Sequence, residues 1–216
     1  MFKIISPGSR SQHAGLIQAM HEMRHRVVVC EWGWEIPGSR AGFEADQFDT
    51  DETAYVLVQN EDGEVVACVR LNPTTQPHML SDLFADYCDL QPWPVGPDVW
   101  ECSRYVTERS KFRDPVEDFE VRCRLGIGLT VYCIDHGITR LSWLTHQKFY
   151  NLVQKVWRTE PLGLPRRSEG DWAWIAAVSQ IDLATLDRQL DRLRNAEAIV
   201  AAYMAPKIAA QFERAV

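Results

Sequence analysis

Two β-rich runs separated by a short turn constrain the fold of this chain most strongly. The runs cover residues 53–59 (TAYVLVQ) and 64–71 (EVVACVRL), and the four residues NEDG join them. β-branched and aromatic residues favour strands, and a short turn that contains Asn and Gly between two such runs indicates an antiparallel hairpin. The sheet of this protein is therefore expected to begin with antiparallel strands.

The rest of the chain alternates helical and strand patterns. Apolar residues at helical spacing predict helices over 14–29, around 81–87, over 115–137, over 147–157 and from 181 onward. Further strands are predicted over 99–107, 138–145 and 171–180. This order predicts a mixed α/β sandwich, in which helices flank a twisted sheet that starts largely antiparallel. We expect one domain over residues 1–180 and a C-terminal helical extension over 181–216, with leucines 183, 186, 190 and 193 on one buried face.

Charge and composition exclude several classes of protein. The 216 residues include 23 Lys and Arg against 30 Asp and Glu, a net charge of -7, which argues against a general nucleic-acid binder because the phosphate backbone would be repelled. No apolar stretch approaches the roughly 20 residues that a membrane span needs. The N-terminus lacks the apolar core of a signal peptide. We therefore expect a cytoplasmic protein with no membrane partner.

Cysteine and histidine give little support for a metal site. None of the six cysteines forms a C-x-x-C pair, which favours apolar packing in a reducing compartment over disulfides or metal binding. His21 and His25 lie one helical turn apart, but H-E-M-R-H lacks the order of the H-E-x-x-H zinc motif.

The candidate chemistry begins in an irregular acidic segment between residues 30 and 53. Glu44, Asp46 and Asp49 lie within six residues, with Phe48 among them and Trp34 upstream. A charge run is most often a solvated face. Carboxylates pair with ammonium groups, however, and aromatic rings attract sulfonium or ammonium, so this segment suits a cationic ligand.

Charged residues also interrupt runs that otherwise have the composition of buried strands. Arg70 follows VVACV, and Glu101 and Arg104 lie in W-E-C-S-R. Buried charges are paired or functional, so we expect an ion-pair network that also includes Arg24 and the loop acids, and such a network could hold a ligand. Strand alternation predicts that Glu101 and Ser103 share one face and that Arg104 lies on the other.

Taken in order along the chain, these residues resemble the acyl-homoserine-lactone synthases, the autoinducer synthase family of bacterial quorum sensing. The resemblance covers about residues 20–165. It rests on Arg24, Trp34, the E-x-D-x-F-D of residues 44–49, the R-L-x-P-T of 70–74, Met79-Leu80 with Phe84, and the W-E-x-S-R of 100–104. One departure is Val28, where the family usually has an aromatic residue.

The resemblance implies an N-acetyltransferase-like three-layer sandwich, in which two central strands splay to form a cleft for an acyl thioester. We expect these to be the strands that contain Arg70 and residues 100–104. The implied substrates are S-adenosylmethionine and an acyl group carried on acyl carrier protein or coenzyme A. The implied products are an N-acyl-L-homoserine lactone, methylthioadenosine and the free carrier. No metal and no cofactor are implied.

The methionine amine must lose a proton before it attacks the thioester, so a carboxylate is expected to act as the base. Glu44 is the first candidate and Glu101 the second. Asp46 and Asp49 are expected to orient the amine, and Arg24 and Arg104 to hold the substrate carboxylate that later closes the ring. The residues expected to bind S-adenosylmethionine are Arg24, Val28, Trp34, Asp46, Asp49, Arg70, Ser103 and Arg104.

An acyl pocket is expected between the sheet and the helix behind it. Its expected members are Trp100, Cys102, Ser142, Trp143, Leu144, Thr145 and Phe149. Pocket and core have the same composition, so each of these could equally be a core residue. The bulk of Trp100 and Trp143 favours a short, branched or aryl acyl group over a long straight chain.

Two local features bear on the carrier. Residues 138–167 contain six bases and the single acid Glu160, a stretch that would attract acidic acyl carrier protein or the phosphates of coenzyme A. The segments E-P-L-G-L-P and E-G-D-W-A-W are similar to a subgroup of the family that uses coenzyme A thioesters of branched or aryl acids, which favours coenzyme A. The R-L-G-I-G of residues 124–128 could be a pyrophosphate loop or a helix-packing motif.

Two other functions remain open from the sequence. One is a related N-acyltransferase that acts on a different amine. The other is a sensor that binds S-adenosylmethionine without turnover, although a pure binder has no need of a candidate base together with the arginines.

Overall fold

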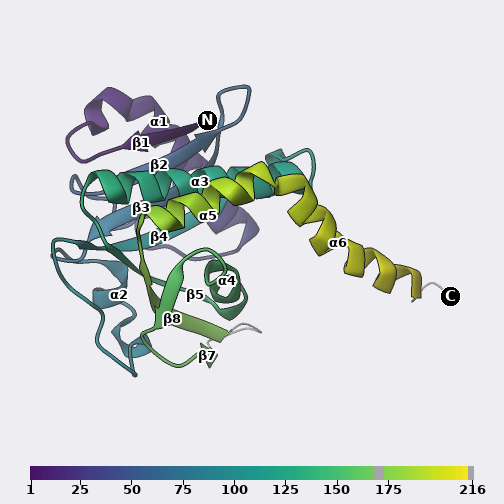
Figure 1. Cartoon of the computed structure of the whole chain (residues 1–216). Helices are drawn as coiled ribbons and strands as arrows, with labels where there is room; N and C mark the ends of the chain where they lie inside the picture. The colour runs from purple at the N-terminus through teal and green to yellow at the C-terminus, as the bar shows by residue number, and fades with distance from the viewer. Residues whose placement is uncertain (168–172, 214–216) are drawn as a thin grey trace.

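The computed structural model describes residues 1–167 and 173–213, with side chains through residue 205. The sheet has the order β1-β2-β3-β4-β5-β8-β6, and β7 pairs with β8 (Figure 1). The strands are β1 (Phe2–Ile5), β2 (Ala54–Gln59), β3 (Val65–Pro73), β4 (Val99–Thr107), β5 (Arg140–His146), β6 (Arg158–Pro161), β7 (Arg166–Arg167) and β8 (Ala173–Gln180). The helices are α1 (Ala14–Arg24), α2 (Met79–Asp82), α3 (Pro115–Asp135), α4 (Gln147–Val153), α5 (Leu183–Arg194) and α6 (Ala196–Glu213).

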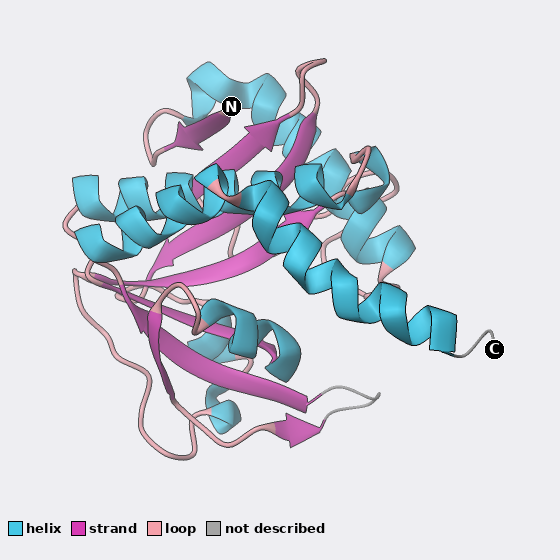
Figure 2. Cartoon of the chain, turned by 45° about the vertical axis from the view of Figure 1, so that its right-hand side comes forward, coloured by secondary structure: helices cyan, strands magenta, loops and turns pink. Residues whose placement is uncertain are grey.

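The predicted fold class is confirmed. β2 and β3 form the predicted antiparallel hairpin, and helices cover both faces of the sheet (Figure 2). Alternate residues of β2 enter two separate cores. Val56 and Val58 face α3, whereas Tyr55 and Leu57 face α1. The strand β1 was not predicted, because its four residues FKII are too few to show a period; it pairs with β2 at the sheet edge.

The split in the sheet lies between β4 and β5. These strands run parallel and pair from Val99 to Glu101 with Arg140 to Ser142. Beyond that point β4 continues alongside β3, and β5 alongside β8. The prediction that the strands of Arg70 and Glu101 separate is therefore wrong, because β3 and β4 stay paired along most of their length.

A bulge in β4 changes which side chains share a face. Arg70 pairs with Ser103 and Cys68 with Val106, so β4 has one residue more than β3 over this interval. Arg104 absorbs the extra residue with a φ of 51°. Arg104 consequently joins Glu101 and Ser103 on the α1 face, and the prediction that it lies on the opposite face is wrong.

The glycines of R-L-G-I-G lie in the middle of α3 and serve packing. A Cβ at Gly128 would lie 2.7 Å from Val56 Cγ1, and one at Gly126 would lie 3.0 Å from Gln189 Nε2. Helix α3 can therefore approach the sheet and α5 closely at these positions. The pyrophosphate-loop interpretation is wrong, because both glycines are buried within the helix.

The helix α5 packs along α3, as both cartoons show (Figures 1 and 2). Its buried residues are Thr185 and Gln189, whereas Leu183 is 67% exposed. The prediction that Leu183 lies on the buried face is therefore wrong, because the buried residues of α5 are the polar Thr185 and Gln189. Helix α6 extends away from the body, and the boundary at residue 180 stays a prediction.

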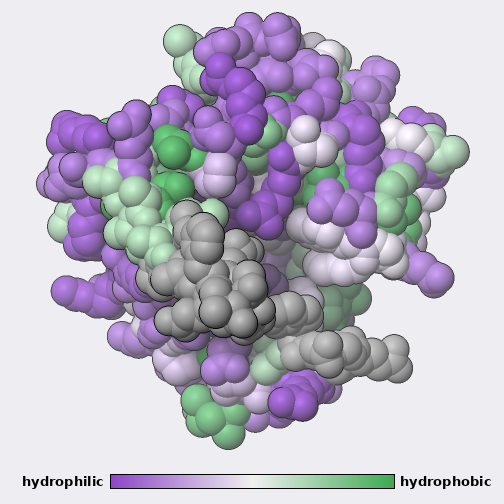
Figure 3. All heavy atoms as spheres, turned by 90° about the vertical axis from the view of Figure 1, so that its right-hand side faces the viewer, coloured by the Kyte–Doolittle hydropathy of each residue, from purple (hydrophilic) through white to green (hydrophobic). Residues whose placement is uncertain are grey.

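On the face toward which the C-terminus points, the residues drawn outside the grey atoms are mostly hydrophilic (Figure 3). Over the described part of the chain, no helix has both the length and the apolar character that crossing a membrane requires. All six cysteines are free thiols; Cys68 and Cys133 are buried, and Cys30 is exposed.

Candidate active site

Three arginines and three carboxylates from four parts of the chain meet on the α1 face of the sheet. The side chain of each is 5% exposed or less. They are Arg24 of α1, Arg70 of β3, Arg104 of β4, and Glu44, Asp46 and Asp49 of the irregular segment. The predicted ion-pair network is confirmed for Arg24, Arg70 and the loop acids, but its inclusion of Glu101 is wrong, because that carboxylate bonds to backbone N–H groups instead. The formal charges of the six residues sum to zero.

Arg24 joins two of the acids. Its Nη1 and Nη2 donate to Asp49 Oδ1 and Oδ2 at 2.7 and 2.9 Å, and its Nε donates to Glu44. Burial alone would raise the pKa of Asp49, but the guanidinium groups of Arg24 and Arg70 outweigh burial and hold that pKa well below its usual range. Asp49 is therefore a fixed negative charge.

Arg70 and Arg104 share Asp46. Arg70 Nη1 donates to Asp46 Oδ1 at 2.5 Å, and Arg104 Nη2 donates to Asp46 Oδ2 at 2.7 Å. Arg104 Nε also donates to Glu44 Oε1 at 3.1 Å, while Arg70 Nε donates to Ser103 Oγ at 3.0 Å. Both guanidinium groups are thus held in one orientation on the α1 face of the sheet, which Arg104 reaches because of the β4 bulge.

Local hydrogen bonds shape the acidic segment. The Phe48 N–H donates to Asp46 Oδ1, and the Asp46 N–H donates to Asp49 Oδ2. Phe48 is buried, and the Asn72 side chain donates to its carbonyl at 2.8 Å. The segment therefore folds around its own carboxylates and is anchored to β3.

Glu101 lies beside this cluster without joining it. Its carboxylate accepts the backbone N–H groups of Met79 and Leu80 at 3.1 and 2.6 Å, and it is 2% exposed. Burial raises the pKa of Glu101 to about 7, although these two N–H groups and the nearby Arg70 lower it. Glu101 can therefore exchange a proton near neutral pH.

Met79 connects Glu101 to the arginines. Its backbone holds the carboxylate, while its Sδ lies 3.0 Å from Arg70 Nη2 and 3.5 Å from Arg104 Nη1. Met79 was part of the sequence motif, but the spacing of the residues did not predict that its side chain contacts the arginines of the site.

Trp34 and Val28 lie apart from the charges. Trp34 is 37% exposed, and its ring centroid lies 5.2 Å from that of Trp32 and 6.0 Å from that of Trp174 on β8. The contact with Trp174 was not predicted, because it joins segments 140 residues apart. Val28 is fully buried in the core beneath α1, and its part in ligand binding stays a prediction.

The predicted acyl-pocket residues divide between the two faces of the sheet. Ser142 and Leu144 lie on the face of Glu101. The alternate residues of β5, Trp143 and Thr145, turn to the α3 face, where Trp100, Cys102 and Phe149 also pack. Trp143 is fixed there, because its Nε1 donates to Ser179 Oγ at 3.0 Å. The buried Ser142 Oγ has no hydrogen-bond partner within the described residues.

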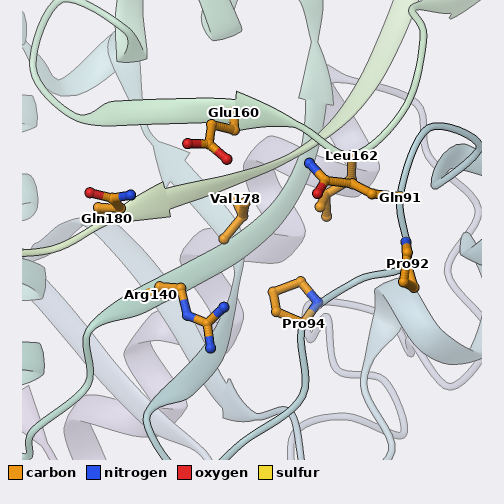
Figure 4. A pocket seen from close by; sticks show the side chains of 8 residues that line it. All are labelled: Gln91, Pro92, Pro94, Arg140, Glu160, Leu162, Val178 and Gln180. Atoms are coloured by element: carbon orange, nitrogen blue, oxygen red, sulfur yellow. The ribbon is translucent and has the colours of Figure 1, made fainter.

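The basic stretch is partly neutralised in the structure. Arg166 pairs with Asp89 at 2.8 Å, an acid that lies outside the stretch in sequence. Arg140 and Glu160 line a cavity of about 300 Å³ on the sheet (Figure 4). Residues 169–172 of the E-G-D-W-A-W segment lie outside the described residues.

Comparison with known proteins gives consistent findings over most of the chain. A family model described as autoinducer synthase matches residues 9–187. An acyl-homoserine-lactone synthase of Ralstonia nicotianae is 33% identical over 171 residues, which cover 77% of this chain and 83% of that protein. An isovaleryl-homoserine lactone synthase of Bradyrhizobium diazoefficiens is 32% identical over 89% of this chain and 85% of its own length.

Solved structures agree with this result. The structure of BjaI, a CoA-dependent acyl-homoserine lactone synthase with SAM and isopentyl-CoA, has a TM-score of 0.78 and 29% identity over 89% of both chains. A putative N-acetyltransferase from Lactobacillus plantarum has a TM-score of 0.53 and 18% identity, covering 84% of this chain and 99% of its own, so it shares the fold alone.

Proposed function

The chain belongs to the autoinducer synthase family and is an acyl-homoserine-lactone synthase. We propose that the charge cluster, the buried set of three arginines and three carboxylates described above, binds S-adenosylmethionine. We further propose that Glu101 is the general base that deprotonates its amine. The observation that carries this proposal is the contrast between two buried carboxylates. Both oxygens of Glu44 accept from arginines, whereas Glu101 accepts from backbone N–H groups and has a pKa of about 7. The second candidate from the sequence is thus preferred over the first.

The cluster suits the amino-acid end of S-adenosylmethionine. Asp46 and Asp49 are placed to attract the ammonium, and Arg24 and Arg104 to hold the carboxylate, once ligand groups replace some of the internal ion pairs. Trp34, with Trp32 and Trp174 beside it, offers aromatic faces to the sulfonium or the adenine.

The first step is acyl transfer. Glu101 takes a proton from the ammonium directly or through water, the nitrogen attacks the thioester carbon, and the carrier leaves as a thiolate that is then protonated. A new amide bond replaces the C–S bond of the thioester. The split between β4 and β5 lies at Glu101 and Ser142, and backbone N–H groups released there would stabilise the oxyanion.

The second step closes the ring. The substrate carboxylate attacks the carbon attached to the sulfonium, the C–S bond breaks, and methylthioadenosine leaves. The sulfonium is already an activated leaving group, so orientation by Arg24 and Arg104 supplies most of what this step needs.

We place the acyl chain on the face of Glu101, along Ser142 and Leu144. A set of partly buried apolar residues covers this face, and it comprises Phe84, Tyr87, Cys88, Trp93, Leu144 and Val178. The opposite face at the same strands is closely filled by Trp143, Tyr132 and Tyr150. This placement differs from the prediction of one pocket that contains both sets.

Coenzyme A is the carrier we favour, with a branched or aryl acyl group. Its support is the similarity to the isovaleryl-homoserine lactone synthase and to the CoA-dependent BjaI, together with Arg158 and Arg167 on the exposed surface. Acyl carrier protein is the competing carrier.

One assay tests all of these points. Purified protein is incubated with S-adenosylmethionine and the same acyl groups on coenzyme A and on acyl carrier protein, and mass spectrometry identifies the products. We expect lactone and methylthioadenosine in equal amounts, with higher kcat/KM on coenzyme A. Acylated amine without methylthioadenosine would indicate an N-acyltransferase of another kind, and no turnover with any thioester would leave only the sensor hypothesis.

A further inference from the structure

The carboxylate of Glu101 is held by a very short helix. The four-residue α2 presents the backbone N–H groups of Met79 and Leu80 to the two Glu101 oxygens, at 3.1 and 2.6 Å. Among the described residues, no other donor bonds to this buried carboxylate. A helix of this length is unstable by itself in water. The contacts that fix the first turn of α2 therefore also fix Glu101.

His78 fixes that turn as the N-cap of α2. Its Nδ1 accepts the Ser81 N–H at 3.1 Å, and Ser81 Oγ accepts the His78 N–H at 3.3 Å, so the two residues form a capping box. The first three N–H groups of the helix thus all have partners. Glu101 accepts the first two, and His78 accepts the third.

The protonation state of His78 follows from this contact. A backbone N–H can only donate, so Nδ1 is the accepting nitrogen and the proton of the neutral ring lies on Nε2. Burial lowers the pKa of His78 although Asp82 opposes the shift, so the ring is neutral near pH 7. Nε2 is buried and has no hydrogen-bond partner within residues 1–167 and 173–213. An unpaired buried donor is costly, so an apolar side chain would pack here with less loss, and the cap is what the histidine adds.

Charged groups on several elements surround Glu101. They are Arg70 on β3, Arg104 on β4, Asp46 of the irregular segment and Asp82 in the first turn of α2. The residues that pair with Glu101 on β3 and β5 are neutral. The two N–H groups of α2 lower the pKa of Glu101 together with Arg70, against burial and Asp46. Loss of these two bonds would therefore raise that pKa further.

We propose that His78 is a positioning residue for the reaction: with Ser81 it holds the first turn of α2, and that turn holds the Glu101 carboxylate where it can take the proton of the amine. The neutral ring caps the helix without adding a second negative charge beside the base, as an aspartate cap would. The inference rests on the proposed function, because it concerns the residue proposed as the base.

The test measures kcat/KM from pH 5 to pH 9 in variants of His78. His78→Leu fills the space but cannot accept the Ser81 N–H, so the acid limb of the profile should move up by about one pH unit, a tenfold loss at pH 6. At pH 9 the rate should stay within about twofold of the wild type, since Glu101 is then ionised in both proteins. His78→Asn retains a neutral capping oxygen and should restore the wild-type profile.

A second variant and a control accompany this pair. Ser81→Ala removes half of the capping box and retains the bond from the Ser81 N–H to the ring, so the acid limb should move in the same direction by a smaller amount. Asp182→Ala is the control, because it removes the cap of α5, where Asp182 Oδ1 accepts the Thr185 N–H at 2.7 Å. This helix packs along α3, so the profile should match that of the wild type.

The outcomes separate this inference from the proposed function. An unshifted acid limb in His78→Leu, or in Ser81→Ala if His78→Leu does not fold, would overturn the positioning role while Glu101 remains the base. An equal loss at every pH that His78→Asn does not restore would also overturn it, because it indicates a purely structural role. A wild type without an acid limb near pH 7, or without methylthioadenosine release, would instead overturn the proposed function.

Discussion

The two halves of one sheet face are built in opposite ways. On the β3–β4 half, buried arginines and carboxylates bond to one another, and each charge has a fixed partner. On the β5–β8–β6 half, the same face carries partly buried apolar side chains and an open cavity. The first half is suited to one ligand of fixed charge, and the second can accept apolar groups of different shape. Under the proposed function, the reaction depends on the charged half and the choice of acyl group depends on the apolar half.

Glu101 lies where the two halves meet. It is the last residue of β4 that pairs with β5, and its carboxylate is held by α2, which packs on both strands. Unlike Glu44, it has no guanidinium bonded to it. A carboxylate in this position can accept a proton from an amine on one side while the thioester lies on the other.

The largest effect is expected from Glu101→Gln, which retains the shape but removes the base. Loss of a general base lowers kcat by about 10²–10⁴-fold. The measurement is methylthioadenosine release at saturating substrates, with Glu120→Gln as the control, since that partly exposed carboxylate of α3 pairs with Arg124 and lies outside the site. Turnover within a few-fold of the wild type would transfer the role of base to another group, with Glu44 the next to test.

Arg24→Met is expected to break the charged half itself. It leaves Glu44 and Asp49 buried with one guanidinium partner fewer each, so that only Arg104 still bonds to Glu44, and such a change costs about 3–5 kcal/mol in the free energy of unfolding. Urea unfolding followed by circular dichroism measures this loss. Arg113→Met, which removes a 72% exposed side chain, should change the stability by less than about 1 kcal/mol. Similar losses for the two variants would mean that the cluster adds nothing beyond a surface pair.

The same division explains what the sequence could predict. Arg24, Glu44, Asp49 and Arg70 could be grouped from sequence, because charges in buried strands must meet partners. The face of Arg104 could not, since it depends on a bulge that only the register against β3 reveals. The position of the split between β4 and β5 was also missed, because parallel pairing over only three residues produces no recognisable pattern in the sequence of either strand. Long elements such as α3 were predicted well, because their apolar residues recur at a spacing that can be seen in the sequence itself.

The pH dependence tests the boundary residue further. Because the pKa of Glu101 is raised from 4.5 to about 7, kcat/KM should rise with pH up to about 7 and then level off, falling about tenfold per pH unit below that value. A profile that stays flat from pH 5 to pH 8 would contradict this role.

Whereas kcat/KM should rise with pH, the contribution of Glu101 to the free energy of unfolding should fall as pH rises. A raised folded-state pKa means that the folded protein holds the Glu101 proton more tightly than the unfolded chain does. This contribution to stability is present below about pH 4.5 and is lost as pH rises through about 7. Glu101→Gln should therefore gain stability relative to the wild type between pH 5 and pH 8, by about 1–3 kcal/mol. Urea unfolding at both pH values gives this difference.

The smallest effect is expected from Gly163→Ala, which disturbs only the cover of the apolar half. A Cβ at Gly163 would lie 1.9 Å from the Tyr87 carbonyl oxygen, and the adjacent Leu162 carbonyl accepts the N–H groups of Leu90 and Gln91. The substitution must push this covering segment away, at a cost of about 1–3 kcal/mol. We expect a higher KM for the acyl thioester and an unchanged KM for S-adenosylmethionine, because the charge cluster has no contact with this segment among its hydrogen bonds. Gly15→Ala is the control, since a Cβ there meets nothing within 4 Å. If both KM values rise together, the two halves are mechanically coupled and their separate roles do not hold.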